Sequence, residues 1–151
     1  MRSPAKKYFS NKWRKDHGGA MVEFAIVLPL LLILVFGIIE LSLVLHNKSV
    51  LTNATREGAR AGIAYDFLNE QFPTEGEIKQ VVKNYCIDRL IPKGNQITNE
   101  NIIVTPIPST NPVRLSVKIE NYDHSFITLN FLSLGNSISL GAETVMFFLS
   151  P

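Results

Sequence analysis

The stretch that decides the fold is Phe24–Ile39, FAIVLPLLLILVFGII, which contains no charged residue. Thirteen of its 16 residues are Leu, Ile, Val or Phe, and together they favour insertion by roughly −4 to −8 kcal/mol on the translocon scale. The flanking acids Glu23 and Glu40 lie about 25 Å apart along a helix that rises about 1.5 Å per residue, so they can sit near opposite bilayer interfaces. The stretch therefore predicts a membrane-spanning helix.

The charge distribution predicts the orientation of this helix. The chain of 151 residues has a formal net charge of +2, but residues 1–17 alone carry +5 and the remainder carries −3. Cations confined to one flank of an apolar helix favour a cytoplasmic N-terminus and an exported C-terminal part. They do not favour nucleic-acid binding, for which cations should spread over a folded face. The six basic residues of the arm are Arg2, Lys6, Lys7, Lys12, Arg14 and Lys15.

A secretory signal peptide is the competing interpretation, because it also begins with a basic stretch. Its apolar region should span only about 7 to 15 residues and precede a small-x-small cleavage site closely. Here Leu41–Leu45 prolongs the apolar character, and the candidate site Ala59-Arg60-Ala61 lies some twenty residues too late for a signal peptidase. We therefore favour a retained helix.

The junction between the arm and the helix has the form G-x-x-x-x-E-F, from Gly18 to Glu23-Phe24. This resembles the site cut by prepilin peptidases, which would cleave between Gly18 and Gly19 on the cytoplasmic face. Glycine lets a backbone lie extended in a protease groove, and Glu23 near the new helix start would meet the positive end of the helix dipole. Glu23 could also neutralise the new α-amino group of a neighbouring subunit. The alternative is an interfacial acid that only caps the helix.

Three segments together resemble the TadE-like family of minor pseudopilins from tight-adherence (Flp-type) pilus systems. They are Met21–Ala25 with Pro29, then Gly37–Glu40, and later Thr55–Gly62. The stretch Ile138–Met146 is more weakly similar to that family's terminal strand.

The resemblance implies an inner-membrane protein that helps to assemble or initiate a thin adhesive pilus and that either enters the filament or stays at its base. Its implied partners are a prepilin peptidase, other pilins or pseudopilins, the inner-membrane assembly platform and the lipid bilayer. We expect three parts: a basic cytoplasmic leader (1–18), a transmembrane and assembly helix (19–64), and an extracytoplasmic α+β domain (65–151).

Two features of the long helix invite specific hypotheses. Pro29 cannot donate to the carbonyl of Ala25, so it is either merely tolerated or a deliberate bend. Small residues recur at every fourth position, Ala54, Gly58 and Gly62, and form a ridge on which another helix could pack closely. The alternative for the ridge is a fraying helix end.

The exported part predicts a second helix and a sheet. Thr74 and Glu77 have the spacing of a capping box, and an apolar stripe with helical period follows, up to a stop at Pro92–Asn95. The stripe comprises Ile78, Val81, Val82, Tyr85, Cys86 and Leu90, so Cys86 is interpreted as a core residue.

Strands are predicted after the helix. Residues 113–120 alternate between apolar and polar, Asn121–His124 has turn chemistry, and Phe126–Leu132 could return as a partner strand. Thr144–Leu149 and the short Ile102–Thr105 are further strands. The expected fold class is α+β and pilin-like: a long N-terminal transmembrane helix, then one helix packed on a three- to four-stranded antiparallel sheet.

No catalytic or metal site is predicted, and no cofactor is expected. His17, His46 and His124 lack a second ligand at metal spacing, and no phosphate-binding loop is present. The protein is therefore expected not to be an enzyme. Two alternatives remain: an uncleaved single-pass anchor that displays a small binding or adaptor domain, and a membrane-tethered hydrolase that uses His124.

Overall fold

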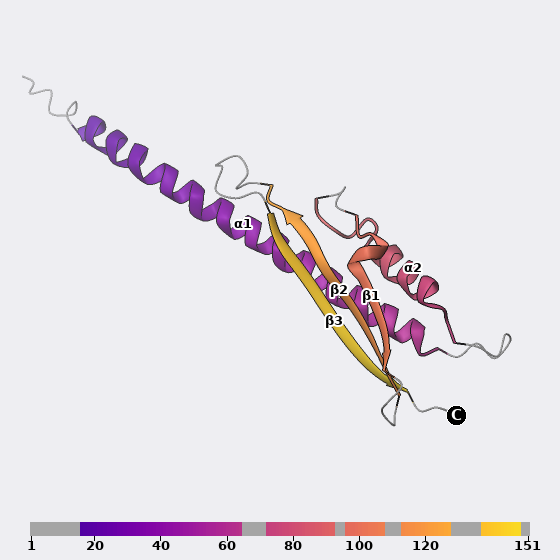
Figure 1. The fold of residues 1–151 in the computed structure, drawn as a ribbon. Helices are drawn as coiled ribbons and strands as arrows, with labels where there is room; N and C mark the ends of the chain where they lie inside the picture. The colour runs from indigo at the N-terminus through magenta and orange to yellow at the C-terminus, as the bar shows by residue number, and fades with distance from the viewer. Residues whose placement is uncertain (1–15, 65–71, 93–95, 108–112, 128–136, 149–151) are drawn as a thin grey trace, which may run out of the picture. The chain divides into compact units, whose positions relative to one another are not determined.

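The computed structural model describes residues 16–64, 72–92, 96–107, 113–127 and 137–148. The elements, in chain order, are α1 (Asp16–Gly62), α2 (Glu75–Cys86), the short 3-10 helix η2 (Asn99–Asn101), β1 (Ile102–Ile107), β2 (Val113–Ser125) and β3 (Ser137–Phe148) (Figure 1). The expected α+β fold, with a long apolar N-terminal helix, a second helix and an antiparallel sheet, is confirmed. The chain divides into two compact units, one ending at Phe36 and the other beginning at Gly37.

Helix α2 starts as its sequence predicts. The Thr74 hydroxyl accepts a hydrogen bond from the Glu77 backbone N–H at 3.4 Å, and Glu77 Oε2 accepts one from the Thr74 N–H at 2.7 Å. This reciprocal capping box satisfies two N–H groups at the helix start. The helix ends at Cys86, earlier than the predicted stop at Pro92–Asn95, because Ile87 leaves the helical conformation with ψ of 134°. Asp88 follows in a left-handed conformation with φ of 65°.

The sheet has the strand order β1-β2-β3, and both pairings are antiparallel. The apolar face predicted in β2 is confirmed, since Leu115, Val117 and Ile119 are buried. On the other face Ser116 is also buried, and its hydroxyl donates to Glu143 Oε1 at 2.9 Å. Two strand predictions are wrong. Asn121–His124 is not a turn but the continuation of β2, and β3 begins at Ser137 instead of Thr144.

A fourth strand is not seen within the described residues. Phe126 and Ile127 follow the end of β2 without joining a strand, and 128–132, the rest of the predicted partner strand, lie outside the described residues. Leu149, the predicted end of the last strand, also lies outside them.

A bulge in β2 changes which residues face the helices. The register runs from Ile119 opposite Ala142 to Tyr122 opposite Leu140, so β2 carries one extra residue there. Asn121 takes a positive φ of 54°, and Asn101 Nδ2 donates to the carbonyl oxygens of Glu120 and Asn121 at 3.1 Å each. Odd-numbered residues face the core before the bulge and even-numbered ones after it, so Tyr122 and His124 point inward.

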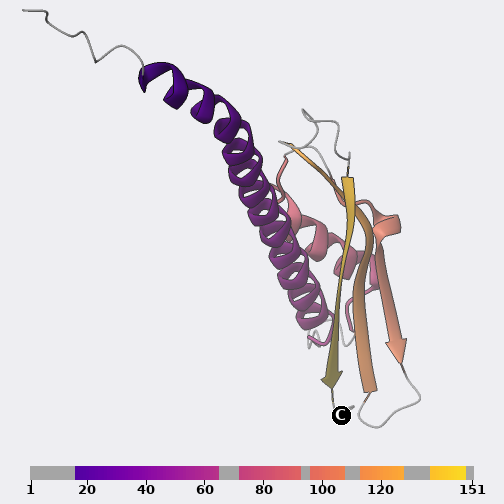
Figure 2. The same ribbon diagram turned by 90° about the vertical axis from the view of Figure 1, so that its left-hand side faces the viewer.

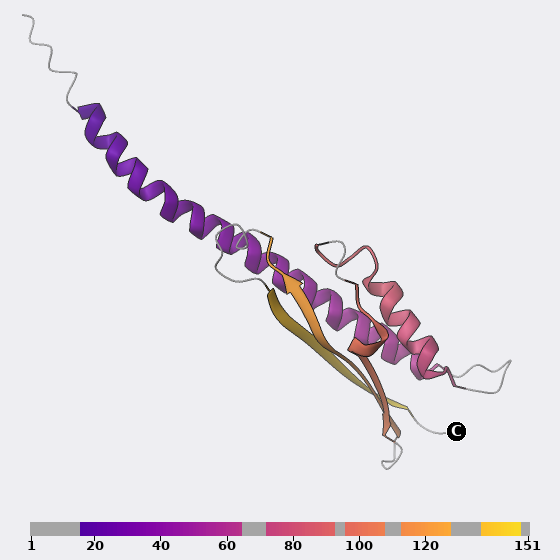
Figure 3. The same ribbon diagram turned by 45° about the horizontal axis from the view of Figure 1, so that its top comes forward.

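Within the unit that begins at Gly37, α2 and the C-terminal half of α1 lie on the same face of the sheet (Figures 2 and 3). The predicted packing layer comprised α2 alone, but α1 also contributes buried residues to the core. The core comprises Val50, Leu51, Ala54 and Ala59 of α1, Ile78, Val82 and Cys86 of α2, Ile102 of β1, Leu115, Val117, Ile119 and Tyr122 of β2, Ala142 of β3, and Leu90 and Ile97 from the connections.

Candidate functional site

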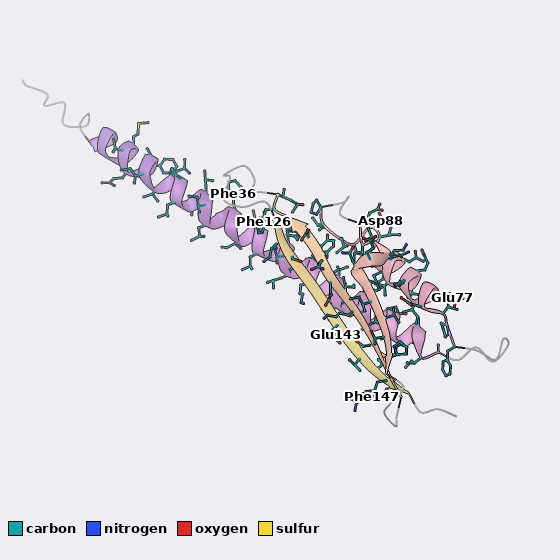
Figure 4. All side chains as sticks on the ribbon, in the orientation of Figure 1. Phe36, Glu77, Asp88, Phe126, Glu143 and Phe147 are labelled. Carbon is teal, nitrogen blue, oxygen red and sulfur yellow. The ribbon has the colours of Figure 1, made fainter. Side chains whose placement is uncertain are left out.

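The N-terminal part of α1 exposes apolar side chains on all its faces. The Leu, Ile, Val and Phe side chains from Val22 to Ile39 are exposed, except that of Leu28, which is half-buried. Figure 4 shows side chains along this part of the helix. A helix that is apolar all round needs an apolar surround. By length and composition, Gly18–Gly62 contains a segment that can cross a membrane, and none of that segment is buried within the protein.

The predicted processing residues lie in the first turns of this helix. Gly18, Gly19, Glu23 and Phe24 are all exposed, and a Cβ added at either glycine would have open space around it. Pro29 lies inside α1, and helix continues on both sides of it. Glu23 belongs to the unit that ends at Phe36, and its side chain is exposed. It is therefore accessible to an enzyme or to another subunit.

The small-residue ridge of α1 packs within the compact unit. Ala54 is fully buried, and a Cβ added at Gly58 would overlap the side chain of Val82 on α2. A Cβ at Gly62 would overlap Leu115 on β2 and come within 2.8 Å of Ile78 on α2. The missing side chains therefore allow α1 to lie close to both α2 and the sheet.

A buried polar cluster joins α1 to the end of β2. Its members are Glu40, Asn47 and His124, whose exposed fractions are 2 %, 0 % and 0 %. His124 Nε2 lies 3.4 Å from Glu40 Oε1, and His124 Nδ1 lies 2.8 Å from Asn47 Nδ2. Glu40 Oε1 also accepts a hydrogen bond from the Ile127 backbone N–H at 3.2 Å. Buried polar groups need such partners, because leaving one unpaired costs about 1–3 kcal/mol.

The geometry determines how the protons are arranged in this cluster. Asn47 Oδ1 accepts from the Ile91 N–H at 3.0 Å, so Asn47 Nδ2 must face both the Ile91 carbonyl and His124. An amide nitrogen only donates, and His124 Nδ1 is therefore the acceptor. The ring proton then belongs to Nε2, which donates to Glu40. His124 is thus held between an amide and a carboxyl group.

Further polar contacts attach α1 to its surroundings on both sides of this cluster. His46 Nε2 lies 3.0 Å from the Arg89 carbonyl oxygen, and Lys48 Nζ donates to the Gly141 carbonyl. Deeper along the helix, the Thr55 hydroxyl lies 2.8 Å from the Thr144 hydroxyl. Side chains of the second half of α1 therefore fix this helix to the turn that follows α2, which contains Arg89, and to β3.

Cys86 is buried in the core, as predicted from its place in the apolar stripe of α2. Burial raises the pKa of its thiol to about 11, and the positive charge of Arg89 offsets only part of this effect. The thiol is therefore protonated at neutral pH and has little nucleophilic character. Within the described residues, no group of three or more His, Cys, Asp or Glu side chains could hold a metal ion.

Comparison with known protein families finds a similarity that lies in the long helix. The family model described as TadE-like protein matches residues 18–60. The N-terminal helix is TadE-like. No curated protein and no solved structure matches the chain.

The TadE-like match agrees with the resemblance drawn from the junction and from the residues after it. It covers both the exposed apolar part of α1 and most of the part that packs on the sheet, including Glu40, Asn47, Ala54 and Gly58. The matched part of α1 therefore has an exposed apolar stretch up to Ile39, and after it residues that are buried in the protein core, among them Leu51 and Ala54.

The cluster around His124 was not predicted from the sequence. His124 was interpreted as a turn residue and Glu40 as an interfacial acid, whereas both are buried. A usable signal was the helical spacing of Glu40 and Asn47, which lie seven residues apart on the face that continues as Leu51 and Ala54. Asp123 is exposed while His124 is buried, so these neighbours point to opposite sides of β2.

Proposed function

We propose that this protein is a minor pseudopilin of a tight-adherence pilus system, that a prepilin peptidase processes it, and that it acts in pilus assembly or initiation. The observation that carries the proposal is the TadE-like helix, which begins at a G-x-x-x-x-E-F junction and is charge-free and largely exposed from Phe24 to Ile39. The role is structural, and its partners are other pilins or pseudopilins, the inner-membrane assembly platform and the bilayer.

The proposed organisation follows the charge and the junction. Residues 1–18 form a cytoplasmic leader, 19–64 the transmembrane and assembly helix, and 65–151 the extracytoplasmic part, in a bacterial inner membrane. The basic arm supports a cytoplasmic N-terminus. Removal of the leader would take away its charge of +5 and leave Glu23 as the fifth residue of the mature chain.

The junction is suited to a protease. A Cβ added at Gly18 or Gly19 would meet open space, and two adjacent glycines weaken the first turn of α1 by about 1 kcal/mol each relative to alanine. Local unwinding into an extended substrate is therefore inexpensive at this point of the helix. An apolar helix end without glycines would resist such unwinding.

The test is the N-terminus of the mature protein from cells with an active prepilin peptidase. We expect it to begin at Gly19, and we expect Gly18→Leu to prevent cleavage, because a branched side chain replaces the one hydrogen that the groove must accommodate. Gly37→Leu is the matched control: Gly37 also has open space around it but lies away from the junction, so its variant should mature normally.

A retained leader in the wild-type protein would contradict the proposal and favour the alternative, an uncleaved single-pass anchor that displays a small binding or adaptor domain. Cleavage of both glycine variants at the wild-type rate would also contradict it. Mass spectrometry of the purified membrane form distinguishes these outcomes directly.

A further inference from the structure

An apolar surface remains unexplained at one end of the unit that begins at Gly37. Four large side chains there are between 43 % and 60 % exposed: Leu41 and Leu45 of α1, Ile127 after β2, and Ile138 near the start of β3. We call these four residues the apolar collar. All four belong to the same compact unit, so their relation to one another is defined.

The buried cluster fixes the level of the collar along α1. Glu40 accepts a hydrogen bond from the Ile127 N–H, and Ile138 is paired in the sheet with His124, which contacts both Glu40 and Asn47. Ile127 and Ile138 are thereby held beside the helix turn that contains Leu41 and Leu45. Leu41 and Leu45 lie one turn apart on the helix face opposite Glu40 and Asn47.

That level coincides with the end of the apolar run of α1. The uncharged stretch ends at Ile39, one residue before Glu40. Leu41 and Leu45 lie about 1.5 and 7.5 Å beyond Glu40 along the helix axis, and the headgroup layer of one leaflet is about 5–8 Å thick. Leu41 and Leu45 therefore fall within the thickness of the interfacial layer when the charge-free stretch fills the hydrocarbon.

The polar groups beside the collar suit a partly apolar surround. The Ser42 hydroxyl donates to the Ile38 carbonyl at 2.8 Å and presents no free donor to lipid. Glu40, the acid nearest to this level on α1, is turned inward and 98 % covered by the protein. At this level of α1, the carboxyl group of Glu40 is therefore covered, and the exposed side chains of the collar are apolar.

We propose that the apolar collar rests in the interfacial layer of the bilayer and seats the folded domain directly on the membrane. The occupant is lipid, because Leu41 and Leu45 follow the charge-free stretch in sequence and the single acid between, Glu40, is buried. This inference depends on the membrane placement in the proposed function, and its test separates the two.

The experiment uses the full chain in vesicles of phosphatidylethanolamine and phosphatidylglycerol. In a Trp13→Phe background, one tryptophan at a time is introduced by Ile127→Trp, Ile138→Trp, Phe147→Trp or Leu31→Trp. Phe147 is the matched control, because it is exposed on the same sheet but lies at the end opposite Phe126 and the collar (Figure 4). Lipids that carry a quencher near the headgroup report contact with the interface.

We expect the tryptophans at positions 127 and 138 to be quenched at least about twofold more than the one at 147, given the thickness of the interfacial layer. Equal quenching at 127, 138 and 147, with position 31 quenched by chain-labelled lipid, overturns the collar and leaves the membrane helix intact. An unquenched position 31 overturns the membrane placement itself. Emission at 138 that follows the protein-to-lipid ratio without lipid quenching shows that a second copy covers the surface, and it overturns the proposal as well.

Discussion

Asn47 connects three groups: the backbone N–H and carbonyl of the partly buried Ile91, and Nδ1 of the buried His124 ring. Its amide has one orientation only, because the Ile91 N–H requires the oxygen. The fixed orientation in turn determines which ring nitrogen of His124 accepts a hydrogen bond from Asn47. A single side chain of α1 therefore sets the hydrogen-bond pattern with Ile91, which follows α2, and with His124 of β2.

We predict that Asn47→Ala lowers the free energy of unfolding by about 2–3 kcal/mol, since the substitution leaves buried donors and acceptors unpaired. Urea unfolding of the full chain in detergent, followed by circular dichroism, measures the loss. Asn53→Ala is the matched control: Asn53 contacts only the exposed Arg56 among the hydrogen bonds described, and its change should stay within about 0.5 kcal/mol. Equal losses in the two variants would refute the role given to Asn47.

The Cys86 thiol provides a pH-dependent prediction. Its folded-state pKa of about 11 lies above the ordinary 9.0, so the folded state holds this proton more tightly than the unfolded state does. Its contribution to stability is complete below pH 9 and is lost as the pH rises towards 11. We expect the wild type to lose more stability over this range than Cys86→Ala, as measured by urea unfolding at each pH. Parallel curves for the two proteins would contradict the assignment; Tyr122, whose pKa burial also raises, is present in both.

Helix α1 depends on glycine where it meets two other elements. Gly58 faces Val82 of α2 and Val117 of β2, and no space remains for a methyl group. In a water-soluble helix such a glycine would be a weakness, since alanine is favoured by about 1 kcal/mol. Here the close approach of the backbones outweighs that preference.

Gly58→Ala is therefore predicted to destabilise the protein by about 1–3 kcal/mol despite its better helix propensity, because the added methyl group displaces Val82. Thermal unfolding in detergent tests this. The control is Gly76→Ala in α2, where the nearest atom to an added Cβ is Thr74 Oγ1 at 4.0 Å, and this variant should be neutral or slightly more stable. Stabilisation by both substitutions would exclude a packing role for Gly58.

For the chain as a whole, the sequence predicted what local patterns control. The charge-free run of α1, the Thr74 capping box and the alternation around Val117 each follow from neighbours in sequence. The inward orientation of His124 does not, because it depends on the bulge, and the bulge depends on Asn101 and on partners across the sheet. Asn121–His124, whose residue types are typical of turns, instead continues strand β2.

The burial of Glu40 escaped prediction for the same reason. Its local context is an apolar helix end, where an acid ordinarily faces the lipid headgroups or water. Its partners are His124 and Ile127, more than eighty residues away. Only the fold brings these groups together.

The proposed assembly role makes a prediction about Glu23. In the full pilus system, Glu23→Ala should reduce pilus formation strongly while membrane insertion stays near wild type, because removal of an acid makes insertion of the helix easier by about 2.5–3.5 kcal/mol at most. Pilus counts by electron microscopy and carbonate extraction of membranes measure the two effects. Glu57→Ala, which removes an exposed acid of α1 outside the apolar run, is the control. Normal pili with Glu23→Ala would contradict the assembly role of this acid.

The extra residue in β2 has a consequence for how this chain can vary. Between Ile119 and His124, the count of residues determines which side chains face α1, and Gly141 lies opposite, where an added Cβ would come within 2.9 Å of the Ile119 carbonyl oxygen. Loss of one residue there would turn the inward-facing side chains at the end of β2 outward and the outward-facing ones inward. Asp123 and Ser125 would then face Glu40 in place of His124. Related chains can therefore be expected to gain or lose residues in pairs at this place, or to change the acid of the helix when they do not.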